Sequence, residues 1–178
     1  FGFLFGGTTT LLGNTGVALA GGFDTPGGLV VSGPATLSAV DVAAGSSVEF
    51  QDDVLLAGGS ATSISAGTLA LFSDTLDATE GEGLSVTFSS GSGGDALFNG
   101  AIGAALSDRN ISASQLGAID LSSVANADFA STVYAEGLRV SGLAGSSVAF
   151  GDAVMLDAAP FSGRALRVTG GDIDFANG

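Results

Sequence analysis

The side chains best suited to chemistry in this sequence are carboxylates that stand close to glycines. Asp172 and Asp174 flank Ile173 in a stretch with strand periodicity, so both carboxylates are expected on its outer face, and Asn177 follows. A further carboxylate, Asp95, comes directly after a glycine-rich segment at 91–94. Carboxylate and amide oxygens are the ligands that Ca²⁺ takes in proteins. These four residues are therefore the Ca²⁺ candidates, with solvent-facing turn carboxylates as the alternative, and we predict no other cofactor.

Two other acidic pairs have the composition of a glycosidase active site. Asp52 and Asp53 are adjacent, and Glu80 and Glu82 are separated by one glycine. Glycoside hydrolysis uses two carboxylates that flank the bond to be broken. However, Asp52 recurs as Asp152 within a repeated segment, and a residue repeated with the scaffold is expected to shape a corner. We therefore predict no catalytic residue and no enzyme, with a polysaccharide-active enzyme as the remote alternative.

The residue types that are missing exclude most other chemistry. The chain of 178 residues contains no Lys, His, Cys or Trp. It therefore has no Ser-His-Asp or Cys-His nucleophile, no ordinary zinc site, no Schiff-base lysine and no disulfide scaffold. Eighteen acidic residues against four arginines give a net charge of −14, which cannot neutralise a run of phosphates. We predict no nucleic-acid partner.

Short apolar runs, separated by Gly, Ser, Asp or Asn, must position the carboxylates. Apolar and other residues alternate with a period of two within each short run, as in the segments 48–50 and 86–88. This pattern is typical of short strands between tight turns. A hydrophobic fraction of 46% with only 12% charged residues argues against disorder.

One segment occurs twice in the chain, in nearly the same form. Residues 44–56 (AGSSVEFQDDVLL) and 144–156 (AGSSVAFGDAVML) are identical at nine of thirteen positions, and residues 85–88 repeat their Ser-Val-x-Phe core. The distances along the chain between the three copies are all close to multiples of ~20 residues. Apolar pairs follow at similar spacing, at Leu29/Val31, Val48/Phe50, Leu69/Leu71, Val86/Phe88, Ala104/Leu106, Ala127/Phe129, Val148/Phe150 and Ile173/Phe175.

This periodicity predicts an all-β fold, namely a right-handed parallel β-helix (β-solenoid) with ~20-residue coils. About nine coils would fit in the chain, with like residues stacked at ~4.8 Å. We expect one domain over residues 1–178, either alone or as a segment of a longer chain. A β-sandwich or jelly roll, which also contains many short strands, is the alternative.

The composition and the repeat resemble those of passenger and adhesin β-helices of the filamentous-haemagglutinin and autotransporter kind, on residues 144–150 and 170–178. The resemblance implies an extracellular protein of the bacterial cell surface. The segment 91–97 is similar to part of the Ca²⁺-binding nonapeptide of RTX proteins, without its consecutive copies. The segment 162–168 is similar to the final coils of bacterial ice-binding β-solenoids, without an array of Thr-x-Thr.

The ends of such a solenoid suggest how the protein acts. Phe1, Phe3 and Phe5 alternate as one apolar face, and open strand edges at both ends can pair with another copy. The uncharged stretch 1–23 lacks a basic flank and is rich in Gly and Thr, so no transmembrane segment is predicted. We predict a non-enzymatic structural or adhesive protein that self-associates into a filament, sheath or stalk. The alternative is a module that binds surface carbohydrate, ice or Ca²⁺ on one face.

Overall fold

The computed structural model describes residues 7–79, 81–103, 116–156, 160–161 and 163–175, and all regular secondary structure in these ranges is β-strand. The strands are β1 (Thr9–Leu12), β2 (Val17–Thr25), β3 (Leu29–Ser32), β4 (Ala35–Ala44), β5 (Ser47–Phe50), β6 (Val54–Ala57), β7 (Thr62–Ala66), β8 (Leu69–Phe72), β9 (Leu76–Ala78), β10 (Leu84–Phe88), β11 (Gly94–Phe98), β12 (Leu116–Phe129), β13 (Val133–Phe150), β14 (Val154–Leu156) and β15 (Leu166–Phe175).

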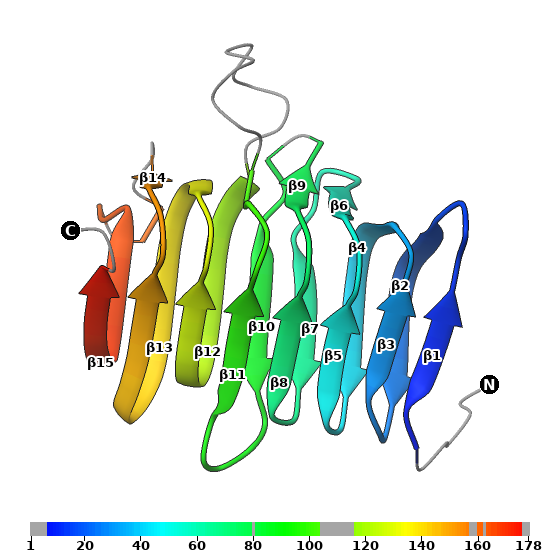
Figure 1. The fold of residues 1–178 in the computed structure, drawn as a ribbon, viewed down its shortest axis with the longest axis horizontal. Coiled ribbons are helices and arrows are strands. Elements are labelled where there is room, and N and C mark those ends of the chain that lie inside the picture. The colour runs from blue at the N-terminus through cyan, green and yellow to red at the C-terminus, as the bar shows by residue number, and fades with distance from the viewer. Residues whose placement is uncertain (1–6, 80, 104–115, 157–159, 162, 176–178) are drawn as a thin grey trace.

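The strands form one continuous sheet that winds into a solenoid of about seven turns (Figure 1). Every strand pair in the described ranges is parallel. In Figure 1 each coil rises on the near side, descends on the far side and advances toward the C-terminal end, which is the right-handed sense. The predicted all-β solenoid is confirmed, and the parallel pairing excludes the sandwich or jelly-roll alternative.

Each coil has three faces. Face A contains β1, β3, β5, β8 and β11 and the second halves of β12, β13 and β15. Face B contains the first halves of β2 and β4, then β6, β9, the start of β13, and β14. Face C contains the second halves of β2 and β4, then β7, β10, the first half of β12, the middle of β13 and the first half of β15. Strands such as β12 and β13 are longer than predicted because they continue around a corner through register shifts.

The coils differ in length more than a strict repeat allows. Val48 pairs with Leu29 of the preceding coil, a step close to the predicted coil length. Ala127 pairs with Ala96 of the preceding coil, a step that is longer by more than half. The longer step includes residues 104–115, which lie outside the described residues. Such long steps explain why the chain makes about seven turns rather than the nine predicted.

Stacked phenylalanines fill the interior beneath face A. Rings on β5, β8, β11, β12, β13 and β15 lie face to face with centroids 4.9–5.2 Å apart, and the interplanar angles do not exceed 20°. Five of the six are at most 1% exposed. These five rings therefore lose nearly all their contact with water and gain stacking contacts with their neighbours. The stacked residues are Phe50, Phe72, Phe98, Phe129, Phe150 and Phe175.

Most of the predicted apolar pairs occupy one inner column, but two do not. The pairs that begin at residues 29, 48, 127, 148 and 173 follow one another along face A in register. On β8 the inward residues are Ala70 and Phe72, so the predicted pair Leu69/Leu71 is one residue out of step. Val86 and Phe88 are buried, but on face C, because β10 pairs with β7 and β12. The pair Ala104/Leu106 lies outside the described residues.

Glycines allow successive coils to approach closely at the corner between faces C and A. A Cβ atom at Gly45 would overlap with the carbonyl oxygen of Pro26, and a Cβ atom at Gly67 would overlap with the carbonyl oxygen of Gly45. Any larger side chain would therefore push neighbouring coils apart at this corner. This close approach accounts for part of the high glycine content.

None of the described elements is a helix long and apolar enough to cross a membrane. Phe1, Phe3 and Phe5, the predicted apolar face, lie outside the described residues, as do Asn177 and Glu80.

Candidate functional site

Three-residue corners join face A to face B and carry the acidic side chains that come closest together. Gln51, Asp52 and Asp53 connect β5 to β6, and residues 73–75 connect β8 to β9 in the next coil. Residues 151–153 form the equivalent corner between β13 and β14. The recurrence of Asp52 as Asp152 is therefore a recurrence of the corner, as predicted.

The middle aspartate of each corner shapes the turn by accepting a hydrogen bond from the next residue. The backbone N–H of Asp53 donates to Oδ1 of Asp52 (2.9 Å), and that of Thr75 donates to Oδ1 of Asp74 (3.0 Å). The N–H of Ala153 donates in the same way to Oδ1 of Asp152 (2.7 Å). An aspartate here satisfies a backbone donor that the turn leaves without a sheet partner, which is why this residue type suits the corner.

Hydrogen bonds between coils hold two corners against each other. The hydroxyl of Thr75 donates to Oδ1 of Asp53 (2.6 Å), and the N–H of Val54 donates to the carbonyl oxygen of Thr75 (2.8 Å). Stacking at the strand spacing therefore brings the carboxylates of neighbouring coils side by side.

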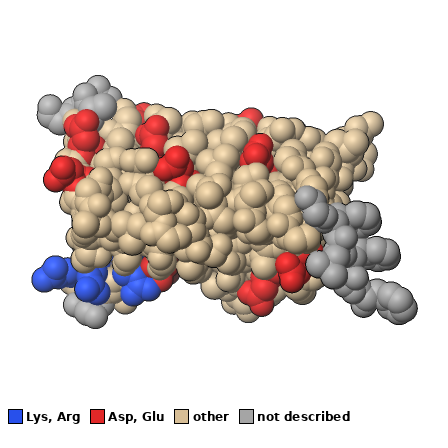
Figure 2. Space-filling model, turned by 90° about the horizontal axis from the view of Figure 1, so that it is seen from below, with Lys and Arg blue, Asp and Glu red and all other residues tan. Residues whose placement is uncertain are grey.

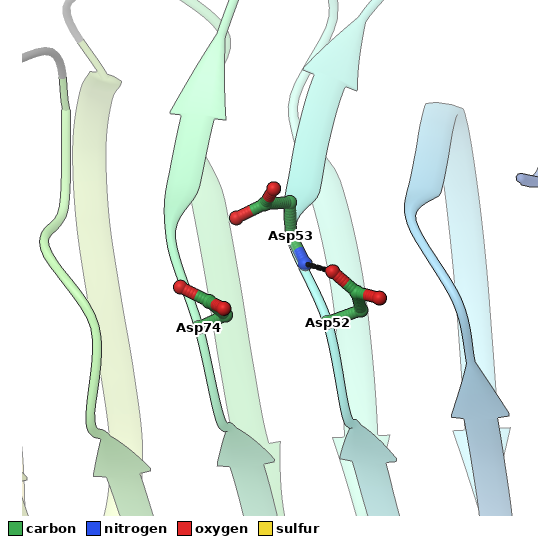
Figure 3. A group of neighbouring side chains, drawn as sticks. All are labelled: Asp52, Asp53 and Asp74. Atoms are coloured by element: carbon green, nitrogen blue, oxygen red, sulfur yellow. Dashed lines mark hydrogen bonds between the residues drawn. The ribbon is translucent and has the colours of Figure 1, made fainter.

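The resulting cluster, Asp52, Asp53 and Asp74, has the spacing of a cation site. One carboxylate oxygen from each residue lies within 4.8 Å of the others, and the three side chains come from the corners of two neighbouring coils (Figure 3). In Figure 3 the carboxylate of Asp52 points to the opposite side of its chain segment from Asp53 and Asp74. Asp53 and Asp74 are exposed and Asp52 is half-buried. Three like charges at this separation repel one another, and a hard divalent cation with oxygen ligands would relieve the repulsion.

A fourth carboxylate, Asp77, lies close enough to be affected by the cluster. Burial raises the pKa of Asp77, and the negative charge of Asp53 raises it further. Oδ1 of Asp77 is buried and has no hydrogen-bond partner among the described residues. Both effects favour the protonated form of this side chain.

A shallow hollow of about 310 Å³ lies beside the cluster toward the N-terminal end. Asp52 contributes to its wall, whereas Asp53 and Asp74 do not. The other lining residues are Leu12, Gly13, Asn14, Ser32, Gly33 and Pro34. The cluster therefore presents one carboxylate to this hollow, whereas a glycosidase places two carboxylates on either side of its substrate.

Of the predicted Ca²⁺ candidates that the structure describes, the fold separates Asp95 from Asp172 and Asp174, which share one outward face. Asp172 and Asp174 are exposed on face A of β15. Asp95 belongs to the same outward column as Asp172, but three strand steps away, roughly 14 Å at the usual strand spacing. The carboxylate of Asp95 instead accepts a hydrogen bond from the amide of Asn126 (2.8 Å), whose own oxygen accepts one from Ser147 (2.8 Å).

In the other predicted acidic pair, Glu80 and Glu82, the carboxylate of Glu82 is buried and hydrogen-bonded within the fold. Glu82 is only 2% exposed, and its Oε1 accepts hydrogen bonds from the backbone N–H of Gly59 (2.9 Å) and the hydroxyl of Thr79 (2.8 Å). These bonds tie the buried carboxylate to Thr79 in the corner of its own coil and to Gly59 in the equivalent corner of the preceding coil. Its partner in the predicted pair lies outside the described residues.

Asp74 is the member of the cluster that sequence reasoning missed. It stands one coil after Asp52, and Phe50 and Phe72, which precede the two aspartates at the same spacing, are paired in register. The signal is therefore the common spacing Phe-x-Asp in two neighbouring coils, which becomes visible only when the coils are aligned. No protein family matches the chain, and no curated protein or solved structure shows significant similarity to it.

Proposed function

We propose that this chain is a non-enzymatic rod segment of an extracellular surface protein, structural or adhesive, that associates with further copies. The continuous stack of coils supports this proposal, because a solenoid of this kind extends by adding coils without changing its interior. The resemblance to adhesin and autotransporter passenger β-helices supports an extracellular setting.

The observation that carries the proposal is the outer edge of β15. Ile173 and Phe175 lie in register with Val148 and Phe150, which are buried, yet they are 45% and 50% exposed. A further coil placed on this edge would bury both side chains and pair the free backbone groups of the strand. A second copy, or further coils of a longer chain, can supply that coil and continue the rod.

Light scattering over a range of concentrations tests the proposal. We expect the particle mass to rise with concentration, and we expect Ile173→Asp to suppress the rise because it places a charge on the surface to be buried. Leu55→Asp is the matched control, since Leu55 is an exposed apolar residue on the side wall (37%) rather than at the end. A particle that stays monomeric at every concentration contradicts the proposed self-association.

We also propose a second function for the corner cluster, the binding of Ca²⁺ by Asp52, Asp53 and Asp74. Their spacing within 4.8 Å favours it. A cation that binds only the folded chain raises the free energy of unfolding by ~2.7 kcal/mol at 100 times its Kd.

Thermal denaturation with and without Ca²⁺ tests this second function. The Tm of the parent chain should rise with Ca²⁺, and the rise should disappear in Asp53→Asn/Asp74→Asn. Asp128→Asn, which removes an exposed carboxylate from face A, should keep the full rise. An equal rise in all three proteins would assign the effect to general charge screening and remove the site.

A further inference from the structure

Face C carries two regular rows of outward side chains along the rod. The first row runs in register from β2 to β15, and the second row stands two positions further along each strand. The inner residues between the rows, such as Val42, Ile64 and Val86, are buried. The first row is Gly22, Asp41, Ser63, Ser85, Asp120, Arg139 and Arg167, and the second is Asp24, Ala43, Ser65, Thr87, Ser122, Ser141 and Thr169.

Two acidic side chains of this face lie at one end of the rod, and its arginines lie at the other end, where the acidic Asp120 forms an ion pair with Arg139. Asp24 and Asp41 lie at the N-terminal end and are exposed, with no side-chain partner among the described residues. The described arginines, Arg139, Arg164 and Arg167, gather near the C-terminal end, at the left of Figure 2. The strands between the two ends carry mostly Ser, Thr and Ala on this face, so a flat partner can approach closely.

The arrangement is self-complementary about β10. Asp41 on β4 and Arg139 on β13 each lie two strand steps from β10, on opposite sides, and occupy the same row. Asp24 on β2 and Arg167 on β15 each lie three steps away. A two-fold axis along β10 would therefore exchange the acidic end of one copy with the basic end of the other.

We propose that face C binds face C of a second copy of this chain, with the two rods antiparallel and the two-fold axis along β10. Asp41 then faces Arg139 of the other copy, and Asp24 lies diagonally within reach of Arg167 of the other copy. Ser85 and Thr87, which lie on the axis, each face the same residue of the other copy. Parallel rods would instead place like charges against each other. This pairing rests on the proposal that the chain associates with further copies, and it adds a contact on the side of the rod to the proposed contact at its end.

Arg139 is already oriented on the face that would be buried. Its guanidinium donates to the carboxylate of Asp120 through Nε (2.7 Å) and through Nη2, and it lies over the ring of Phe161 at 5.1 Å from the centroid. A planar guanidinium held in this way loses little freedom on meeting a second carboxylate. Arg167 has no side-chain partner among the described residues and is exposed.

The size of the face predicts a weak dimer. Strand spacing and rise give an area of roughly 400 Å² per copy, below the ~800 Å² per partner of stable complexes. The net charge of −14 on each copy also opposes encounter at long range. The pairing should therefore be studied at high protein concentration and physiological ionic strength, where screening over ~8 Å removes most of the long-range repulsion.

A single introduced cysteine reports on the two-fold axis, because the chain contains no cysteine of its own. In Ser85→Cys the new thiols of two copies would face each other, and a short bis-maleimide should link them into covalent dimers. Ala149→Cys, at a half-exposed outward position on face A, should give few dimers. Equal linking of the two variants, or no linking of either, would overturn the proposed pairing.

Charge exchange tests the partners at the ends of the face. We expect Asp24→Arg alone and Arg167→Asp alone to weaken the dimer at least tenfold, and an equimolar mixture of the two variants to restore it, since each then meets an opposite charge. Asp128→Arg on face A, which changes the net charge by the same amount as Asp24→Arg, should pair more tightly than Asp24→Arg does. A mixture that pairs no better than either variant alone would contradict the proposed contact between the ends.

The outcomes separate this pairing from the rod proposal. Concentration-dependent growth into long particles, without linking at Ser85, keeps the rod and removes the face C dimer. Closed dimers that link at Ser85 and do not grow further support the face C dimer and remove end-to-end assembly. A strictly monomeric chain that does not link at Ser85 removes both.

Discussion

At the scale of single residues, Asp77 carries its charge in unfavourable surroundings. Its pKa is raised by burial and by Asp53, so the folded chain holds a proton at pH values where the unfolded chain has lost it. The contribution of this group to stability is therefore fully present below the usual pKa of 3.8 and is lost as the pH rises through the higher, folded-state value.

Asp77→Asn tests this linkage. The variant should have a higher Tm than the parent chain at pH 7, and the difference should close near pH 3, where the parent carboxyl is protonated in both states. Asp24→Asn removes the same charge from an exposed position and should raise the Tm at pH 7 by less than Asp77→Asn does. Thermal denaturation at several pH values measures all three, and a pH-independent difference for Asp77→Asn would contradict the assignment.

At the scale of the strands, the phenylalanine stack dominates the interior beneath face A. Phe98 lies between Phe72 and Phe129, with centroid distances of 4.9 and 5.0 Å. Phe98→Ala should lower the free energy of unfolding by about 3–5 kcal/mol, because it removes a buried ring and leaves a cavity between two others. Phe175→Ala, which removes a half-exposed ring with one stacking neighbour, should cost about 1–2 kcal/mol. Chemical denaturation of both variants measures the two losses of unfolding free energy, and the loss in Phe98→Ala should be the larger.

The glycine stack at the corner between faces C and A gives a second test at this scale. Gly67→Ala should lower the free energy of unfolding by roughly 1–3 kcal/mol, since its Cβ would overlap with the backbone of the neighbouring coil. Gly22→Ala is the matched control, because a Cβ at Gly22 meets no atom within 4 Å. The control should change stability by less than about 1 kcal/mol. Equal effects of the two substitutions would show that backbone entropy, and not close approach, explains the loss.

The strands and their inner column were predictable because the alternation of apolar and polar residues and the repeated segment can both be seen within short stretches of the sequence. Phe50 and Phe150, and Asp52 and Asp152, occupy equivalent places in the fold, as the repeated segments predict. The face on which Val86 lies was not predictable, since Ser-Val-x-Phe suits any of the three walls. The cluster of Asp52 with Asp74 and the two rows on face C depend on the register between coils. That register is set by the lengths of the corners, which vary from coil to coil and therefore produce no regular spacing in the sequence.

At the scale of the whole molecule, the coils should behave as exchangeable units. Deleting residues 48–69 removes one coil and joins Ser47 to Ala70, which occupies the position that Val48 held. We expect a folded, shorter solenoid with strand-type circular dichroism and a cooperative thermal transition. Deleting residues 48–58 removes about half a coil, brings different faces into one column and should abolish the transition. If both deletion variants fold equally well, the columns of inner side chains do not determine the register between neighbouring coils.

The coils form a linear stack in which each coil contacts only its neighbours, and this arrangement determines how the molecule would respond to mechanical tension. Each inner ring of the stack touches the ring before it and the ring after it, so pulling on one end loads the terminal coil and leaves the distant coils unstressed. The chain should then yield stepwise, one coil at a time. Because the coils differ in length, each release would lengthen the tether by a different amount. Such a rod would absorb a sudden pull by unravelling from its end while the remaining coils keep their shape.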